Sequence, residues 1–322
     1  MRSVEVATAA RLHLGFLDLN GGLGRRFGSI GLSIDAFETR VEAAAGGAFQ
    51  TLGYERARSA ALARRVAERL RLDLSGTVTV VSAIPAHSGL GSGTQLALAI
   101  ASALRRLHGV GNDAIEDARI LDRGRRSGAG AALFARGGFV VDVGRGPLTD
   151  VPPVVTRLSF PEQWRIVLIV DPAVEGVHGE DERRAFAALP AMSAQSAGEI
   201  CRRTLMQVLP GVAELDLDAF GEGVAAIQAI LGDHFAPAQG GGRFTSVEVG
   251  RVAEHLRASG ARGVGQSSWG PTAFAFAADS DEAEFFASRA REAAGANVSV
   301  RICAACNRGA AIEAFDPSLR GA

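Results

Sequence analysis

The sequence predicts an α+β protein built from two domains. Its 322 residues are enough for two domains with substantial cores, or for one large domain. Strand patterns dominate the first half of the chain, whereas helix and strand patterns alternate in the second half. Between them, residues 147–161 contain a Pro-Pro pair and little periodicity. We therefore expect domains at residues 1–155 and 156–322.

The first domain is expected to hold most of the strands. Their patterns occur at residues 4–9, 11–19, 29–36, 39–45 and 77–83. Residues 54–70 read as an amphipathic helix, and its arginines are assigned to a solvated face: Arg56, Arg58, Arg64, Arg65 and Arg69. A second helix is expected over residues 95–107. A third is expected to start at a cap on Asn112 or Asp113 and to run to about residue 123.

The second domain is expected to alternate strands with helices. Strand patterns occur at residues 164–171, 273–277 and 297–302. Helix patterns occur at residues 180–189, 194–209, 217–231, 246–258 and 281–293. Asp216 or Asp218 is expected to cap the third of these helices.

The composition excludes several classes of protein. Hydrophobic residues make up 47% of the chain and the formal net charge is −1, which is typical of an ordinary globular protein. We therefore expect neither a nucleic-acid nor a membrane partner. The N-terminal stretch lacks the apolar core of a signal peptide, and three cysteines without a regular pattern suit a reducing compartment. Cytoplasmic residence is expected.

All 34 basic residues are arginine. A Schiff base, a lysine general base and a P-loop lysine are therefore excluded. Any phosphate chemistry must use arginine forks, backbone N–H groups, a helix terminus or a metal ion.

A glycine-rich loop between the strand at 77–83 and the helix at 95–107 predicts an anion site. The loop allows backbone N–H groups to converge on a ligand, and the positive end of the helix adds to the field. Its glycine spacing matches neither a P-loop nor a dinucleotide fingerprint. A plain turn that only caps the helix is the alternative. The residues expected to bind are Ser88, Gly89, Leu90, Gly91, Ser92, Gly93 and Thr94.

A second group of polar residues gathers in the first hairpin. Its loop, residues 20–28, begins with Asn-Gly, a strong hairpin signal. Arg25 and Arg26 lie at the tip, and His13 and Asp18 lie on the strand that leads into it. Two adjacent arginines are most often a solvated pair. Here the combination suits a multiply phosphorylated ligand or its metal.

Two later loops add candidate binding residues. Arg126, Ser127 and Gly128 form a second glycine loop, which is either an anion contact or a plain basic turn. A third glycine loop contains Gly241, Gly242 and Arg243. In the segment Gln266, Ser267, Ser268 and Trp269, small residues lie next to a single aromatic residue, Trp269. This last segment is either a seat for a flat ring or a turn with a buried Trp.

Together these segments resemble the GHMP kinase superfamily along nearly the whole chain. Within it, residues 11–16, 28–32, 126–128 and above all 263–272 (GVGQSSWGPT) are similar to the β-ribofuranosylaminobenzene 5′-phosphate synthases. The kinases typically carry Ser-Gly-x-Asp in the second loop, whereas here Gly130 takes the place of the aspartate. The resemblance implies a ribosomal-S5-like N-terminal domain, a ferredoxin-like C-terminal domain and a reaction other than phosphoryl transfer to an acceptor.

The resemblance also implies a decarboxylating pentosyltransferase of methanopterin biosynthesis. It would condense phosphoribosyl pyrophosphate with 4-aminobenzoate or 4-hydroxybenzoate, with Mg²⁺, and release pyrophosphate and CO₂. The loop at 88–94 would bind a phosphate end, and Arg25 and Arg26 would neutralise the leaving group. Asp18 would hold Mg²⁺ or stabilise the cationic sugar, and His13 would orient the substrate or shuttle a proton. Residues 266–269 and 240–243 would line the ring and its carboxylate.

Two other functions are compatible with the sequence. One is an ATP-dependent small-molecule kinase, which the same loop would serve. The other is a noncatalytic ligand sensor on this scaffold, which loss of the kinase aspartate permits. We also expect a homodimer.

Overall fold

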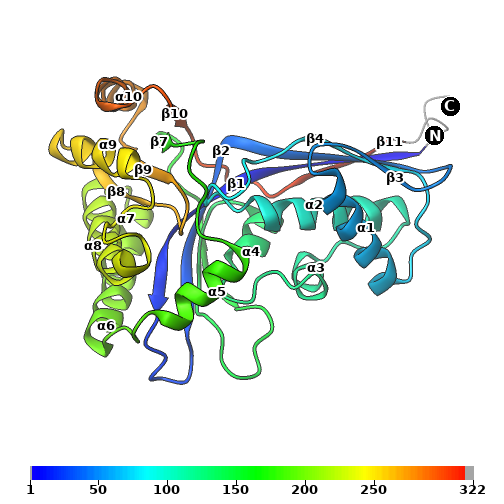
Figure 1. The fold of residues 1–322 in the computed structure, drawn as a ribbon, viewed down its shortest axis with the longest axis horizontal. Coiled ribbons are helices and arrows are strands. Elements are labelled where there is room, and N and C mark those ends of the chain that lie inside the picture. The colour runs from blue at the N-terminus through cyan, green and yellow to red at the C-terminus, as the bar shows by residue number, and fades with distance from the viewer. Residues whose placement is uncertain (1, 316–322) are drawn as a thin grey trace.

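The computed structural model describes residues 2–315, which two β-sheets organise (Figure 1). The larger sheet contains β1 (Ser3–Asp18), β2 (Phe27–Ala44), β3 (Gln50–Gly53), β4 (Thr77–Ser82), β5 (Phe139–Asp142), β6 (Val154–Leu158) and β11 (Ala311–Phe315). Its main path runs β11-β1-β2-β4-β3, and β5 and β6 extend it from β2. The smaller, antiparallel sheet has the order β10 (Ser299–Cys303), β7 (Arg165–Val170), β9 (Thr272–Ala277) and β8 (Arg262–Gln266).

Helices pack on both sheets. Those beside the large sheet are α1 (Arg56–Leu70), α2 (Ser92–Leu107), α3 (Ala114–Ile120) and α4 (Ala129–Arg136). The later ones are α5 (Gly179–Ala188), α6 (Ala194–Arg203), η1 (Thr204–Val208), α7 (Leu209–Ala213), α8 (Leu217–Phe235), η2 (Ala236–Ala238), α9 (Val247–Ala258) and α10 (Ser280–Ala293). Among residues 2–315, no helix has the length and apolar character needed to cross a lipid bilayer.

One hydrophobic core joins the two sheets. Leu12 of β1 and Leu32 of β2 belong to the same buried cluster as Leu168 of β7 and Phe274 of β9. The opposite faces of β7 and β9 pack on α9 and α10 in a separate cluster. The central strands β7 and β9 are therefore buried on both faces.

The two sheets do not divide the chain at a single point. The domain junction expected after residue 155 falls inside β6, which pairs with β5 in the large sheet. Near the end of the described residues, β11 returns to that sheet and pairs with β1. This pairing covers a sheet edge that would otherwise expose unpaired backbone groups.

Several expected elements differ in extent from the observed ones. The strands expected at 4–9 and 11–19 form the single strand β1, which continues through register shifts at Ala9/Ala10 and His13/Gly15. The expectations at 29–36 and 39–45 likewise merge into β2. The predicted caps are confirmed: Asp113 accepts from the N–H groups of Ile115 and Glu116, and Asp216 accepts from that of Ala219. The short strands β3, β6, β8 and β11 were not predicted.

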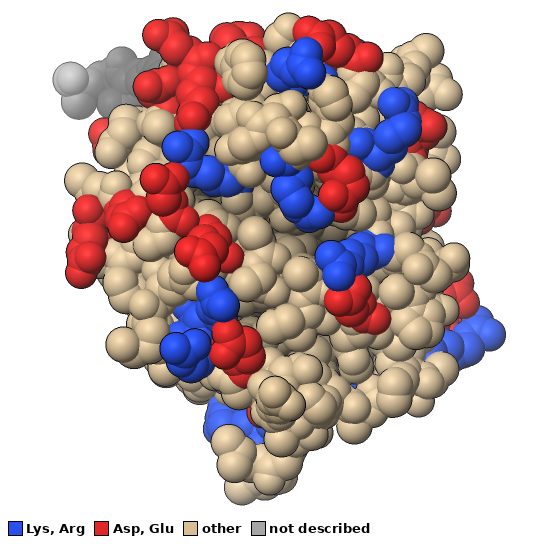
Figure 2. All heavy atoms as spheres, turned by 90° about the vertical axis from the view of Figure 1, so that its left-hand side faces the viewer, with Lys and Arg blue, Asp and Glu red and all other residues tan. Residues whose placement is uncertain are grey.

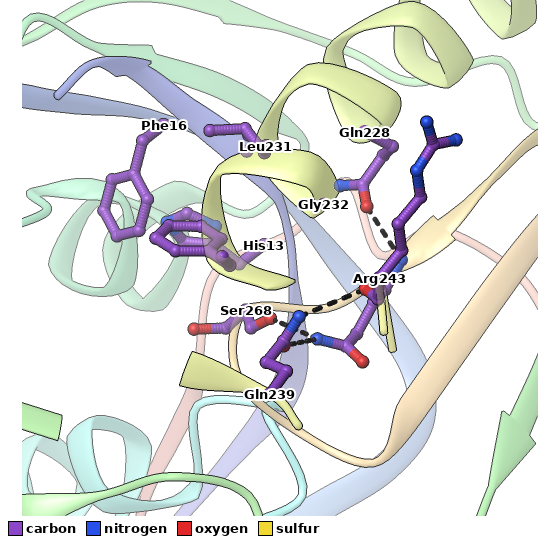
Figure 3. A pocket seen from close by; sticks show the side chains of 11 residues that line it. His13, Phe16, Gln228, Leu231, Gly232, Gln239, Arg243 and Ser268 are labelled. Atoms are coloured by element: carbon purple, nitrogen blue, oxygen red, sulfur yellow. Dashed lines mark hydrogen bonds between the residues drawn. The ribbon is translucent and has the colours of Figure 1, made fainter. Parts of the chain in front are cut away.

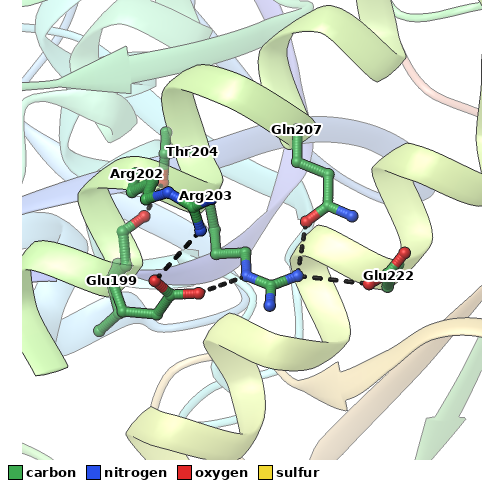
Figure 4. A network of polar contacts seen from close by, with 7 residues as sticks. Glu199, Arg202, Arg203, Thr204, Gln207 and Glu222 are labelled. Carbon is green, nitrogen blue, oxygen red and sulfur yellow. Dashed lines mark hydrogen bonds and ion pairs between the residues drawn. The ribbon is translucent and has the colours of Figure 1, made fainter.

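The helix expected over residues 194–209 contains a π-helical turn, η1. Arg203 stabilises it from the preceding turn (Figure 4). Its guanidinium donates to Glu199 at 2.6 Å and to Gln207 at 2.8 Å, and it lies 3.4 Å from Glu222 on α8. The network connects the wide turn to the neighbouring helix.

Candidate active site

The loop before α2 lines the wall of a cleft of about 550 Å³. The opposite wall comes from residues 176–182, which lead into α5, and from residues 268–270. The lining residues from the loop are Gly89, Gly91, Ser92, Gly93 and Thr94. A cleft of this size can accept a small phosphorylated ligand.

The first turn of α2 presents free backbone donors to this cleft. Gly91 adopts a left-handed conformation with φ of 81°, and no side chain caps the helix. The N–H groups of Thr94 and Gln95 donate to the carbonyl of Gly91. Within residues 2–315, those of Ser92 and Gly93 donate to no protein acceptor. The geometry agrees with the predicted anion site.

Arginines from two other segments reach the same turn. A Cβ atom built on Gly93 would lie 2.4 Å from Nη2 of Arg58 and 3.6 Å from Nη1 of Arg123. Burial lowers the pKa of Arg123, and the charges of Arg58 and Arg65 lower it further. Our assignment of Arg58 to a solvated face is therefore wrong. Helical periodicity reports which face is polar but cannot show that one arginine of that face meets a distant loop.

Many arginines elsewhere in the protein pair with carboxylates. On the face that carries α8, α9 and α10, basic and acidic side chains alternate (Figure 2). Ion pairs there include Arg251–Glu248, Arg257–Glu254 and Arg262–Glu282. By contrast, the Nε of Arg123 is buried without a hydrogen-bond partner in the described part of the chain. Arg58 pairs with Glu55 at 3.2 Å, whereas Arg123 forms no ion pair within residues 2–315. An arginine without a carboxylate partner beside the start of α2 favours an anionic ligand.

The loops at 88–91 and 267–270 meet backbone to backbone. Ser267 Oγ donates to the carbonyl of Gly89 at 2.8 Å and accepts from the N–H of His13 at 3.0 Å. A Cβ atom on Gly89 would lie 2.2 Å from the carbonyl oxygen of Ser267, and one on Gly270 equally close to that of Ser88. Neither glycine can be replaced without moving the other loop. Ser267 thus acts as a link between loops and β1.

His13 lies beside a small closed cavity of about 20 Å³ (Figure 3). The imidazole is 3% exposed, packs against Phe16 with ring centroids 4.5 Å apart, and leaves Nε2 without a partner among the described residues. Burial lowers its pKa well below the usual value, and the charges of Arg11 and Arg126 lower it further. The ring is therefore neutral at pH 7. Ser268 lines both this cavity and the cleft at α2.

Most of the predicted ring-lining residues already have partners. Gln266 accepts from the N–H of Thr245 at 2.6 Å and donates to Gln239 and to the carbonyl of Ser268. Arg243 forms a bidentate pair with Asp233, and Gly241 and Gly242 lie exposed in the same loop. Trp269 lines the cleft, but its ring packs between Phe186 and Phe235, with centroids 5.2 and 4.4 Å away.

The hairpin residues lie apart from the cleft. Asp18 Oδ1 accepts from the N–H groups of Asn20 and Gly21 at 2.7 and 2.8 Å. Arg25 donates to the carbonyls of Val143 and Gly144. Arg25 and the exposed Arg26 line a hollow of about 500 Å³ that shares no lining residue with the cleft. The structure thus does not bring the hairpin together with the α2 loop.

The second glycine loop is fixed by a buried carboxylate that sequence reasoning missed. Asp142, at the end of β5, accepts from Ser29, from Ser127 at 3.2 Å and from the N–H of Gly128 at 3.0 Å. Burial raises its pKa, and the hydrogen bond from Ser29 partly offsets this. Only its position after an apolar strand hinted at such a role.

The helices α2 and α4 approach closely at Gly130, the position at which the GHMP kinases that this sequence resembles carry aspartate. A Cβ atom there would lie 3.0 Å from Cγ2 of Thr94, and Gln95 donates to the carbonyl of Gly130. The helices α4 and α2 therefore pack too closely at this point for a larger residue without a shift.

Comparison with known proteins places these features in a family. Family models for the GHMP kinases N terminal domain and the GHMP kinases C terminal match residues 58–142 and 208–296. A β-ribofuranosylphenol 5′-phosphate synthase of Methanothermobacter thermautotrophicus is 32% identical over 84% of this chain and 87% of its own length. The protein of the same name from Archaeoglobus fulgidus is 33% identical, with the same coverage.

Solved structures agree on the fold. Phosphomevalonate kinase of Streptococcus pneumoniae superposes with a TM-score of 0.72 at 10% identity, covering 95% of this chain and all 100% of its own. A putative homoserine kinase of Listeria monocytogenes gives 0.70 at 14% identity, covering 98% and 100%. The predicted two-domain α+β architecture is confirmed. The chain has the GHMP kinase fold and belongs to the family of the β-ribofuranosylphenol 5′-phosphate synthases.

Proposed function

We propose that this enzyme joins phosphoribosyl pyrophosphate to 4-hydroxybenzoate. The ring carbon that carries the carboxylate attacks the anomeric carbon, and pyrophosphate leaves with the electron pair of the C–O bond. Loss of CO₂ then returns an electron pair to the ring and restores aromaticity. The relatives are named for a phenol product, which supports the hydroxy acid over 4-aminobenzoate. The observation that carries the proposal is this family membership, together with the free N–H groups and the arginines Arg58 and Arg123 that line the cleft at α2.

The cleft supplies what departure of pyrophosphate requires. The N–H groups of Ser92 and Gly93, with Arg58 and Arg123 beside them, form preorganised donors for negative charge that develops on the leaving group. None of these groups transfers a proton. This suits a reaction in which positioning and charge stabilisation contribute most of the rate.

His13 and Ser268 are proposed to handle the proton of the ring hydroxyl. As a neutral base with a free, buried Nε2, His13 can accept a hydrogen bond. Ser268 lines both its cavity and the cleft, so its hydroxyl can pass a proton between them. Arg26 is proposed to attract the anionic donor from the hairpin.

Mg²⁺ is proposed as the counter-ion of the pyrophosphate, whose negative charge it would neutralise. Among residues 2–315, no group of three or more His, Cys, Asp or Glu side chains could hold a metal alone. Mg²⁺ commonly binds one or two carboxylates plus substrate phosphates, and Asp181 lines the cleft. Asp18, the predicted ligand, does not line the cleft and has Oδ1 engaged in the hairpin. The chain therefore fits a metal that arrives with the donor.

The alternatives have less support. A kinase of this superfamily would need an acid or base near its acceptor, and Gly130 provides no side chain at the position where such kinases carry aspartate. A noncatalytic sensor does not account for whole-length similarity to synthases. A cytoplasmic homodimer without nucleic-acid or membrane partners completes the proposal, and light scattering tests the subunit number.

Release of labelled CO₂ tests the reaction. Carboxyl-labelled 4-hydroxybenzoate and 4-aminobenzoate are incubated with the purified protein, phosphoribosyl pyrophosphate and Mg²⁺. We expect release from the hydroxy acid only when all components are present, and loss of release in EDTA. Phosphorylation of a small molecule by ATP, with no CO₂ release, would refute the proposal.

A further inference from the structure

A second pair of arginines lies on the other side of the glycine loop. A Cβ atom on Gly91 would lie 3.3 Å from Nε of Arg11. That nitrogen is buried and has no hydrogen-bond partner in residues 2–315. Arg126 reaches the same cleft through Glu182, which lines the cleft together with Gly91 and accepts a hydrogen bond from Arg126. These side chains are separate from Arg58 and Arg123, which contact Gly93.

A carboxylate from α5 occupies this second pair. Glu182 accepts from Nη2 of Arg126 at 2.5 Å, and the two side chains are 19% and 32% exposed. Burial lowers the pKa of Arg11 to about 10, and Glu182 is the carboxylate that opposes this most. Glu182 also lines the cleft at α2. Glu182 therefore holds the guanidinium of Arg126 at the cleft, where an anionic group of a ligand would compete with it.

The helix that carries Glu182 is anchored at its C-terminal end, where Phe186 packs among Phe16, Phe27, Phe235 and Trp269. None of the α5 residues is buried, and its N-cap residue, His178, makes no capping hydrogen bond. Its main anchor is Phe186, which packs on Trp269 and lies 5.0 Å below the guanidinium of Arg126. A helix held in this way can move when its ion pair is broken.

We propose that Arg11 and Arg126 form a subsite for a phosphate monoester, and that Glu182 occupies it until the ligand binds. The α2 turn with Arg58 and Arg123 then takes the pyrophosphate, and the 5′-phosphate of the donor displaces Glu182. This assignment rests on the proposed function, because only a donor with two phosphorylated ends needs both subsites. It adds Arg11 and Glu182 to the binding residues.

Separate ligands for the two ends test the assignment. Ribose 5-phosphate and pyrophosphate are titrated into the full-length protein by calorimetry. The Glu182→Gln substitution removes the carboxylate that competes with the ligand. It is expected to tighten ribose 5-phosphate binding about tenfold, or about 1.4 kcal/mol. Pyrophosphate affinity is expected to change less than about twofold. Arg58→Gln is expected to weaken pyrophosphate alone.

Glu180→Gln is the matched control, because Glu180 lines the same cleft. This substitution removes the same charge but leaves the ion pair between Arg126 and Glu182 intact. It should alter ribose 5-phosphate binding less than about threefold. In an Arg126→Gln background, Glu182→Gln should no longer tighten binding. The subsite would be overturned if Glu182→Gln and Glu180→Gln changed the affinity for ribose 5-phosphate equally. It would also be overturned if Glu182→Gln raised the affinities for ribose 5-phosphate and pyrophosphate equally. Failure of the wild-type protein to bind pyrophosphate would instead count against the proposed function.

Discussion

Replacement of Gly93 by alanine separates stability from ligand binding. Gly93 lies in the first turn of α2, and its backbone is not in the left-handed region. Alanine is the better helix former by up to about 1 kcal/mol, so Gly93→Ala should unfold at equal or higher denaturant concentration. The added methyl group would lie 2.4 Å from Nη2 of Arg58 and must push this flexible side chain away.

The displaced arginine is expected to weaken pyrophosphate binding strongly. A hydrogen bond from a charged group contributes about 1.5–3 kcal/mol, so its loss corresponds to about 10- to 100-fold in affinity. Calorimetric titration of Mg²⁺-pyrophosphate measures this directly. Gly198→Ala is the control, because Gly198 lies within α6 and a methyl group there meets no atom within 4 Å. It should leave affinity unchanged.

A double-mutant cycle decides whether Arg58 is responsible. In an Arg58→Ala background, Gly93→Ala should cost little additional affinity. If the two losses add instead, the methyl group acts independently of Arg58, by obstructing the ligand itself. No loss of affinity in Arg58→Ala alone would remove Arg58 from the site. Unchanged affinity in the Gly93→Ala single variant would refute the location of the pyrophosphate site at this turn.

Two further predictions concern residues outside that turn. Because the folded-state pKa of His13 is depressed, its contribution to stability is present above the unfolded pKa of about 6.5 and is lost as pH falls below it. His13→Gln should therefore reduce the slope of the unfolding free energy against pH, below pH of about 6.5, by up to about 1.4 kcal/mol per pH unit. An unchanged slope would contradict a neutral His13. Arg26→Gln should lower kcat/KM at least about tenfold with an unchanged melting temperature, since Arg26 is exposed; wild-type kinetics would remove the hairpin from the reaction.

Local sequence patterns were sufficient to predict most helices and to single out the glycine-rich loop before α2. The caps of α3 and α8 were predicted because a capping aspartate acts on the next three residues only. The loop at 88–94 was recognised because glycines before a helix free its N–H groups regardless of the rest of the fold. The strands β3 and β6 were missed, because their residues are mostly exposed or half-buried and show no alternation of burial.

The residues that complete the cleft could not be predicted locally. Arg58 is on α1, Arg123 follows α3, and Glu182 is on α5; no spacing in the sequence distinguishes them from other surface charges. The absence of lysine, the glycine loop and the replacement of the kinase aspartate by Gly130 were determined by the sequence alone. The packing of the sheets and helices decided which arginines face the loop, and it keeps the hairpin apart from that loop. Side chains far apart in sequence meet only through such tertiary contacts.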